Sequence, residues 1–486
     1  MASATEKAAG NPLIRYFKDF AVLKETRSEY WGIQVINLLD STVFFAVLTI
    51  AVVLLSEDFG FTDIDAGYAI TVYASGTTIS LLFAGVLTDW LGIRRSFFLA
   101  MAGQMVTRGA IIAAFFLPDL PQRNLIVWVG FLLMAPFVAM VQTVYQAANK
   151  RFTTRRSRSA GFNLWYLFMN IGAALGGWSI DVVRKTLGMP NIHIFTMGVL
   201  LSAVCIVLTF FLVRREDQLY GPDEEPEPAE PVAPTRRTPL EIAKAVLGES
   251  VFWRFVALIS LLLGVRAVFL YMHLLMPKFW LRVIGPDAAI GALEAVNPVL
   301  VVIGLILLIP ILHRFSVYKM LVFGSMISAA SLFFLAWPAW GQTVYWTSLA
   351  SLAVLTVGEV IWSPRLTEYT AAIAPKGQEG TYLGLSMVPY FLAKTVVSLL
   401  SGHMLVRWVP EAAEGQPILR DRLAAGEIAF WDSPSAMWLI LGAVALAGPI
   451  LALVFRGWFT RGAKWGDGSA AEAAVEAAAA PEAEAS

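Results

Sequence analysis

A series of long apolar segments constrains the fold of this chain more than any other feature. A helix needs about 20 mostly apolar residues to cross the hydrocarbon core of a bilayer. Twelve such segments follow one another, separated by shorter polar stretches. They lie near residues 31–56, 66–88, 96–117, 124–147, 160–183, 192–213, 252–276, 290–312, 317–337, 342–373, 380–406 and 435–456. We therefore predict an all-α membrane protein with twelve transmembrane helices.

The composition agrees with this interpretation and excludes several classes of protein. The chain is 57% hydrophobic and 15% charged, with a mean hydropathy of +0.66, which is far more apolar than a soluble domain. Its net charge is zero, so we expect no nucleic-acid partner. The single Cys205 excludes a disulfide framework. The four histidines lack metal-ligand spacing and the phosphate loop of ATP-driven proteins is missing, so we expect no metal, no cofactor and no enzyme activity.

The positions of lysine and arginine predict the orientation in the membrane. Basic residues gather in every second loop, whereas the loop 57–65 has none and carries four acidic residues. Because positive charge stays on the cytoplasmic side, we expect a multi-pass protein of the cell membrane with both termini in the cytoplasm. The basic residues of the inner loops are Arg94, Arg95, Lys150, Arg151, Arg155, Arg156, Arg158, Arg214, Arg215, Arg236, Arg237, Lys319, Lys376, Arg461 and Lys464.

A polar linker divides the chain into two halves. Residues 216–239 are rich in proline and acidic residues, a composition typical of a solvated linker. We predict a cytoplasmic N-terminal segment without the apolar region of a signal peptide, two bundles of six helices, a linker and a disordered tail. These parts cover residues 1–30, 31–215, 216–250, 251–459 and 460–486.

The two halves resemble distant copies of each other. Asp89–Arg95 ends the second apolar segment, and His313–Lys319 ends the eighth with basic residues at matching spacing but without the acid and the glycine. Gly177 and Gly402 lie at almost the same offset in the fifth and eleventh segments. Parallel repeats of this kind are typical of transporters with a substrate site at the midplane between two bundles. Chance similarity between apolar segments is the alternative.

One loop carries a family signature. The sequence Gly85-Val-Leu-Thr-Asp-Trp-Leu-Gly-Ile-Arg-Arg95 lies where the second apolar segment ends and the third begins. It resembles the loop signature of the major facilitator superfamily, whose members are solute transporters. The resemblance implies two pseudo-symmetric six-helix bundles and a gating role on the inner side for this loop. The residues concerned are Gly85, Asp89, Gly92, Arg94 and Arg95.

Several ionisable residues lie deep inside the predicted helices. They include Asp40, Arg108, Arg266, Glu359 and Lys394. Because a charge at the centre of a bilayer costs a few kcal/mol, each is expected to face a partner or a water-filled cavity. Glu359 and Lys394 lie at similar depths on consecutive helices and could pair directly. Static ion pairs that fix the helix packing are the alternative for each of these residues.

Two of these residues are candidates for proton coupling. A buried carboxylate that loses a neighbouring cation takes up a proton more readily, which makes Asp40 and Glu359 suitable. His273 and His403, near the outer ends of their helices, are alternative proton carriers, and packing or gating is their competing role.

Four further segments are similar to the proton-coupled oligopeptide transporter family. Gly161–Ala173 is an aromatic-rich run that contains Asn-Ile-Gly, and Asn297-Pro298 is followed by Pro310. Gly358-Glu359 precedes Ser363-Pro364, and Ala374–Gly384 resembles the family's loop into the eleventh helix. The matches fall in both halves, so we expect a divergent member of this family.

The resemblance implies a substrate site. Glu359 would meet the amino group of a peptide, and Asn170 and Asn297 would contact its backbone because an amide both donates and accepts hydrogen bonds. Tyr390 would lie near a pocket for an aromatic side chain. As alternatives, Asn170 bonds a neighbouring helix and Asn297-Pro298 marks a helix kink.

The chain also departs from the family pattern. The first helix of the family carries two glutamates and an arginine, whereas the corresponding stretch Asn37–Ser41 keeps only the acid Asp40. The family's lysine in the fourth helix is missing from Met140–Thr143. Lys394 and Arg266 supply cations from other helices and are therefore included among the substrate-binding candidates.

These features together predict a secondary active transporter that works by alternating access. We expect proton-coupled uptake of oligopeptides or of a related zwitterionic or anionic solute, with protons and the lipid bilayer as the other partners. A proton-antiporting exporter of drugs or metabolites is the first alternative. A membrane receptor that binds its ligand on a transporter scaffold without moving it is the second.

Overall fold

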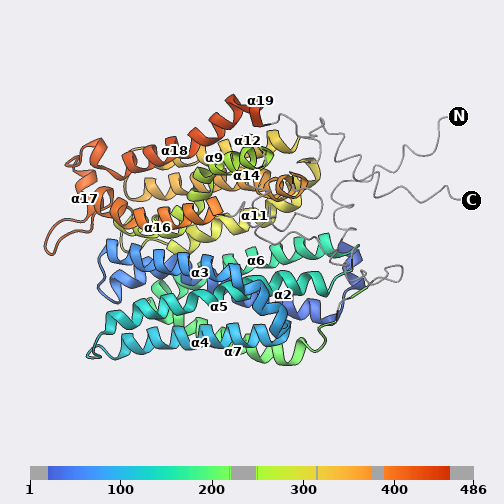
Figure 1. Ribbon diagram of the computed structural model, residues 1–486. Helices are drawn as coiled ribbons and strands as arrows, with labels where there is room; N and C mark the ends of the chain where they lie inside the picture. Colours follow the sequence, from blue (N-terminus) through green and yellow to red (C-terminus); the bar gives the residue numbers. More distant parts are fainter. Residues whose placement is uncertain are drawn as a thin grey trace, which may run out of the picture.

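Two helical bundles lie against each other in the structure, which is a computed structural model (Figure 1). The structure describes residues 20–154, 156–217, 219–220, 248, 250–312, 316–373 and 388–459. Every regular element within these ranges is a helix. Most of the predicted linker 216–250, the tail 460–486 and the loop signature Ala374–Gly384 lie outside the described residues.

The N-terminal bundle contains six long helices. They are α2 (Ser28–Glu57), α3 (Asp63–Leu91), α4 (Ile93–Phe116), α5 (Arg123–Arg151), α6 (Arg158–Asp181) and α7 (Ile192–Leu212), with the short η1 (Ala21–Glu25) and η2 (Val182–Thr186) at its ends. The Thr62 hydroxyl accepts a hydrogen bond from the Asp65 amide and caps α3. Gly92, with φ of +81°, makes the sharp turn from α3 into α4 that a residue with a Cβ rarely adopts.

The C-terminal bundle repeats this arrangement with more interruptions. Its elements are α9 (Ser250–Leu274), α10 (Met276–Val283), α11 (Ile290–Leu312), α12 (Val317–Ala330), α13 (Leu332–Leu335), α14 (Gln342–Ile373), α16 (Val388–Trp408), α17 (Leu419–Ala424), η3 (Phe430–Asp432), α18 (Pro434–Val454) and α19 (Arg456–Phe459). The short helices α10 and α17 were not expected, because each is too short for the apolar pattern that marks a membrane span.

The membrane-spanning helices confirm the predicted fold class. Within the described residues, ten helices are long and apolar enough to cross a bilayer, or eleven if a bent pair counts as one span. That pair is Asp63–Leu81 with Phe83–Leu91, bent by 56°. The predicted eleventh segment, 380–406, is described only from residue 388 onward, as part of α16. The protein is therefore an all-α, multi-pass membrane protein, and the described part does not test all twelve spans.

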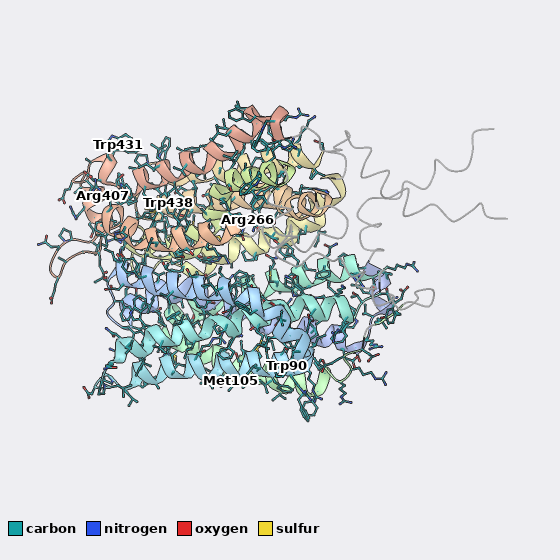
Figure 2. The ribbon with its side chains drawn as sticks, in the orientation of Figure 1. Trp90, Met105, Arg266, Arg407, Trp431 and Trp438 are labelled. Atoms are coloured by element: carbon teal, nitrogen blue, oxygen red, sulfur yellow. The ribbon has the colours of Figure 1, made fainter. Side chains whose placement is uncertain are left out.

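The helices run between two ends of the molecule, which we name by their elements. The terminal end is where α2 begins and α18 ends, and the distal end is the opposite one, where α2 ends and α3 begins (Figure 1). Figure 2 shows Trp431 at the distal end and Trp90 toward the terminal end. Their side chains are 64% and 79% exposed. Exposed tryptophans near both ends are typical of the two membrane–water interfaces.

Close backbone contacts join the two bundles at the distal end. α6 packs on α11 and α3 packs on α16 (Figure 1). A Cβ at Gly291 of α11 would overlap the carbonyl oxygen of Gly177 in α6. A Cβ at Gly402 of α16 would lie 2.5 Å from the carbonyl oxygen of Asp63. Gly177 and Gly402, which the sequence places at matching offsets, thus occupy equivalent contacts on opposite bundles.

Candidate functional site

A cavity of about 390 Å³ lies between the two bundles. α2, α5 and α6 line it from the N-terminal bundle, and α9, α11, α14 and α16 from the C-terminal bundle. Its walls combine aromatic side chains with many polar ones. The polar and charged lining residues are Thr49, Gln142, Tyr166, Asn170, Arg266, His273, Glu294, Asn297, Glu359, Ser363 and Lys394. The cavity therefore offers both signs of charge and uncharged hydrogen-bonding groups.

The structure brings together most of the residues that the sequence selects for substrate binding. Five of the six line this one cavity, although they come from five different helices: Asn170, Arg266, Asn297, Glu359 and Lys394. The side chain of the sixth, Tyr390 in α16, lies outside the described residues. Five of the candidates thus share one cavity, and their roles in substrate binding remain predictions.

Glu359 is held by hydrogen bonds within the C-terminal bundle. Its Oε2 accepts a hydrogen bond of 2.9 Å from Nδ2 of Asn297. The same Nδ2 donates to Oγ1 of Thr356 at 2.9 Å, and Thr356 donates to the carbonyl oxygen of Leu352. This chain fixes the carboxylate of α14 against α11 at the cavity wall.

Arg266 places a positive charge opposite these groups. Its guanidinium carbon lies 5.5 Å from the ring centre of Trp362, which also lines the cavity. An aromatic face attracts a cation and fixes its position without neutralising it. Figure 2 shows Arg266 about midway between the two ends of the molecule. This depth agrees with a binding site near the middle of the membrane.

Asn170 uses its donor within its own helix. Its Nδ2 donates to the carbonyl oxygen of Tyr166 at 2.9 Å, and the side chain is 6% exposed. An amide carries an acceptor oxygen in addition to this donor. Asn170 therefore bonds its own helix while it lines the cavity wall.

Asp40 lies in a separate, smaller chamber inside the N-terminal bundle. This chamber of about 240 Å³ is lined by Asp40, Tyr145, Trp165 and several amides, and it shares Phe44, Phe45, Gln142 and Met169 with the main cavity. Asp40 itself is 8% exposed. The two carboxylates selected for proton coupling, Asp40 and Glu359, thus belong to neighbouring chambers.

Arg108 is the buried cation of the N-terminal bundle. It is 1% exposed, and it donates to Oε1 of Gln104 at 2.5 Å and to Oγ of Ser202 at 2.9 Å. These partners lie on α4 and α7, so Arg108 joins two helices of one bundle. The arrangement supports the packing role that was the alternative for this residue.

A second buried acid, Glu294 in α11, was missed by the sequence interpretation. It is 4% exposed, and its Oε2 lies 3.2 Å from Nδ1 of His273 in α9. The same Nδ1 lies 3.1 Å from Oγ1 of Thr49 in α2. Glu294 occurs only four residues into its apolar segment, so its depth could not be told from the sequence. An acid within an apolar run was the available signal.

A cluster of charges closes the distal end. Asp63 at the start of α3 accepts hydrogen bonds from Lys278 and, at 2.7 and 3.1 Å, from Arg282 of α10. Arg282 also donates to Glu411 at 2.9 Å. All of them lie outside the predicted apolar segments, where charged residues are common, so nothing in the pattern selects them.

A second carboxylate links the bundles at the same end. Asp181, the last residue of α6, accepts hydrogen bonds from the amides of Gly291 and Ala292, at 3.0 and 2.7 Å. These amides belong to the first turn of α11, where a helix presents free N–H groups and favours a negative charge. Asp63 and Asp181 thus fasten the N-terminal bundle to the C-terminal bundle at two positions.

The predicted gating loop is fastened by the residue that begins the linker. Oε2 of Glu216 accepts a hydrogen bond of 2.6 Å from the amide of Ile93, at the start of α4. Arg94 donates to the carbonyl oxygen of Phe210 at 3.1 Å and lies over its ring. Asp89 is exposed, and Gly85 lies within α3. The gating role of this loop remains a prediction.

The comparison with known protein families identifies the class of this protein. The family model described as Major Facilitator Superfamily matches residues 31–398. The chain therefore belongs to the major facilitator superfamily, and it is a transporter of that superfamily by family and fold. A search of curated proteins found no significant match.

Solved structures place the fold more narrowly. The structure entitled "In meso crystal structure of the POT family transporter PepTSo" matches with a TM-score of 0.63 and 15% identity, over 89% of this chain and 98% of that one. An auto-inhibited POT family peptide transporter matches with a TM-score of 0.65 and 15% identity, over 91% and 98%. A POT family transporter in complex with 5-aminolevulinic acid gives 0.65 and 12%, over 89% and 96%. At such identities the likeness concerns the fold.

Proposed function

We propose that this protein carries out proton-coupled uptake of oligopeptides or related small zwitterionic solutes by alternating access. The observation that supports this proposal best is the cavity between the bundles, which contains two carboxylates and two cationic side chains. A zwitterion presents an ammonium and a carboxylate, and a site with both charges can pair with each end. The similar structures include peptide transporters by their titles, which agrees with this substrate class.

Each cavity residue has a role that fits its chemistry. Glu359 accepts hydrogen bonds from the ammonium group, and Arg266 and Lys394 attract the carboxylate at the other end. Asn297 and Asn170 contact the peptide bond, because an amide side chain can both donate and accept. Tyr390 contributes to a pocket for an aromatic side chain of the substrate.

Proton coupling is assigned to carboxylates at the depth of the cavity. Glu359 exchanges its contact with the substrate for a proton when the substrate leaves, and Asp40 provides a second proton position in the neighbouring chamber. A carboxylate in a poorly hydrated site is more easily kept neutral than charged, unless a cation lies beside it. Transport therefore requires that the distance between each acid and its neighbouring cation change during the cycle.

Alternating access follows from a rocking motion of the two bundles. The contacts at the distal end open while those at the terminal end close, with the gating loop from Gly85 to Arg95 acting at the terminal end. With the basic loops on the cytoplasmic side of the cell membrane, the distal end faces outward. The substrate would then enter at the distal end and leave at the terminal end.

Uptake into proteoliposomes tests this function. The full chain is reconstituted, and accumulation of labelled di- and tripeptides is measured with and without an inward proton gradient. We expect gradient-dependent accumulation that falls by at least about tenfold in Glu359→Gln, the equivalent of losing one charged hydrogen bond. Glu414→Gln, at an exposed acid of the distal loop, is the matched control.

The same assay separates the competing functions. If no peptide accumulates, or if Glu359→Gln behaves like the wild type, the peptide proposal is wrong. Extrusion of a labelled drug or metabolite against its gradient would instead identify a proton-antiporting exporter.

A further inference from the structure

Glu294 and His273 are buried titratable residues to which the proposed function gives no role. Oε2 of Glu294 has His273 as its partner, but Oε1 has no hydrogen-bond partner among the described residues. Leaving a buried polar atom without a partner is unfavourable, and a charged one more so. The geometry therefore favours a state in which a proton neutralises the pair.

Thr49 connects this pair to the other bundle. Nδ1 of His273 lies within hydrogen-bond distance of both Oγ1 of Thr49 and Oε2 of Glu294. An imidazole nitrogen holds either one proton or one lone pair. With a proton it donates to the carboxylate, and without one it accepts from the threonine hydroxyl. Thr49 belongs to α2 and the pair to α9 and α11, so the contact exists only while the bundles are together here.

The charges around Glu294 and His273 decide which protonation state of this pair can be buried. The cavity wall also contains Arg266 on α9, Glu359 on α14 and Lys394 on α16, and α6 presents Asp181 to the first turn of α11. Arg266 lies over Trp362, and Nδ1 of His273 lies 3.2 Å from Oε2 of Glu294. A neutral imidazole beside a carboxylate has a net charge of −1, whereas one added proton brings the pair to zero. Excluding water favours the neutral combination.

The break between α9 and α10 also connects this pair to the charge cluster of the distal end. α9 ends at Leu274 and α10 begins at Met276, so His273 and Lys278 lie on the two sides of one break. Lys278 bonds Ser56 of α2 as well as Asp63 of α3. A separation of the bundles at the distal end would therefore break the contact of His273 with Thr49 and those of Lys278 with Ser56 and Asp63.

We infer that His273 and Glu294 form a proton-binding site that is loaded from the distal side and whose proton permits the distal end to close. This inference rests on the proposed function and names a coupling site for it. In each cycle, one proton passes from distal water to the carboxylate oxygen or the imidazole nitrogen. It returns to water when the terminal end opens, and no other bond forms or breaks.

Spin-label distances test the site without any substrate. Asp119 and Glu414 lie in exposed distal loops of opposite bundles, so both are replaced by labelled cysteine in a Cys205→Ser background. We expect the distal-open population of the full chain in nanodiscs to fall as the pH falls, by up to about tenfold per pH unit, the limit for one linked proton. Glu294→Gln, which is always neutral, should lose the pH response and keep the small distal-open population of low pH at every pH.

A further variant serves as a control for this distance measurement. Asp287→Asn, at an exposed acid in the loop before α11, should keep the full pH response. The inference is wrong if the wild type shows no pH response, or if the response survives in Glu294→Gln. If Glu294→Gln does not fold, His273→Gln decides: it must move the midpoint of the response, and an unchanged midpoint overturns the inference.

Transport assays separate this inference from the proposed function. In Glu294→Gln we expect exchange of labelled for unlabelled Ala-Ala across the membrane to continue, because exchange moves no net proton. Accumulation driven by the proton gradient should be lost. Gradient-driven accumulation at the wild-type rate would contradict the inference. If the wild type itself transports no peptide, the proposed substrate is wrong, while the distance measurement still decides the proton site.

Discussion

Buried and half-buried charges in the described part of this protein fall into two groups that differ in where their partners lie. Arg108 is 1% exposed and has its partners on α4 and α7, within one bundle. Asp63 and Asp181 instead have partners on α10 and α11, in the other bundle. His273, the partner of Glu294, contacts Thr49 of the other bundle in the same way.

This difference separates the interactions that stabilise the fold from those that change during transport. If the bundles move as rigid bodies, contacts inside one bundle persist and contacts between bundles are broken and remade. A charge pair within a bundle therefore contributes to stability in every state. A charge between bundles contributes to one state only, so its loss changes the populations of states more than the stability of the fold.

The largest expected effect comes from the charge inside a bundle. Arg108→Ala leaves the amide of Gln104 and the hydroxyl of Ser202 without their donor and removes the cation of a buried cluster. Each buried polar group that loses its hydrogen-bond partner costs about 1–3 kcal/mol, and Arg108 holds two such groups. We expect a large loss of thermal stability in the purified protein and loss of both exchange and accumulation. Arg420→Ala, at a distal surface arginine, is the control. A stable Arg108→Ala variant would contradict the structural role.

The next effect concerns the glycine contact between bundles. In Gly291→Ala the new Cβ would overlap the carbonyl oxygen of Gly177, so the distal end cannot close fully. We expect spin-label distances across the distal end to shift almost entirely to long values, with little loss of stability. Gly109→Ala is the matched control, because a Cβ added at Gly109 meets nothing within 4 Å. Normal closure of Gly291→Ala would show that the bundles adjust at this contact.

A smaller shift is expected from the distal charge cluster. Asp63→Asn keeps an oxygen that can accept one hydrogen bond but loses the charge that Lys278 and Arg282 share. The loss of a charged hydrogen bond costs about 1.5–3 kcal/mol, which raises the distal-open population by roughly tenfold to just over a hundredfold. The same distance measurement reports it. If Asp63→Asn lowers the stability but leaves the distal-open population unchanged, Asp63 belongs to the charges that stabilise the fold.

The sequence was sufficient for the fold class and for much of the cavity, for a physical reason. Glu359, Arg266 and Lys394 stand out because charges inside long apolar segments are costly and rare, so their depth in the membrane can be estimated by counting residues. Family resemblance added Asn297 and Asn170. The direction in which a side chain points around its helix cannot be estimated by counting residues, because neighbouring helices can be rotated about their axes in many ways.

This limit explains what the sequence interpretation could not provide. It did not show that Asp40 belongs to a side chamber, or that Glu294 and His273 meet across two helices. The distal contacts of Asp63 and Asp181 were not recognised, because charges at the ends of helices are common and only the packing of the bundles gives them partners.

The smallest expected effect lies on the surface of one bundle. Oδ2 of Asp217 accepts a hydrogen bond of 2.7 Å from Arg27, before α2, and this bond holds the pKa of Asp217 below its usual value. A lowered pKa means that the contact stabilises the folded protein above the ordinary aspartate pKa of about 3.9 and loses this effect as the pH falls through the lower, folded value. Asp217→Asn should therefore lower the thermal stability slightly at neutral pH, with the difference disappearing in acid. Because Arg27 precedes α2 and Asp217 follows α7, this contact does not cross to the other bundle, and distal spin-label distances should not change. A change would mean that the start of the linker takes part in the motion.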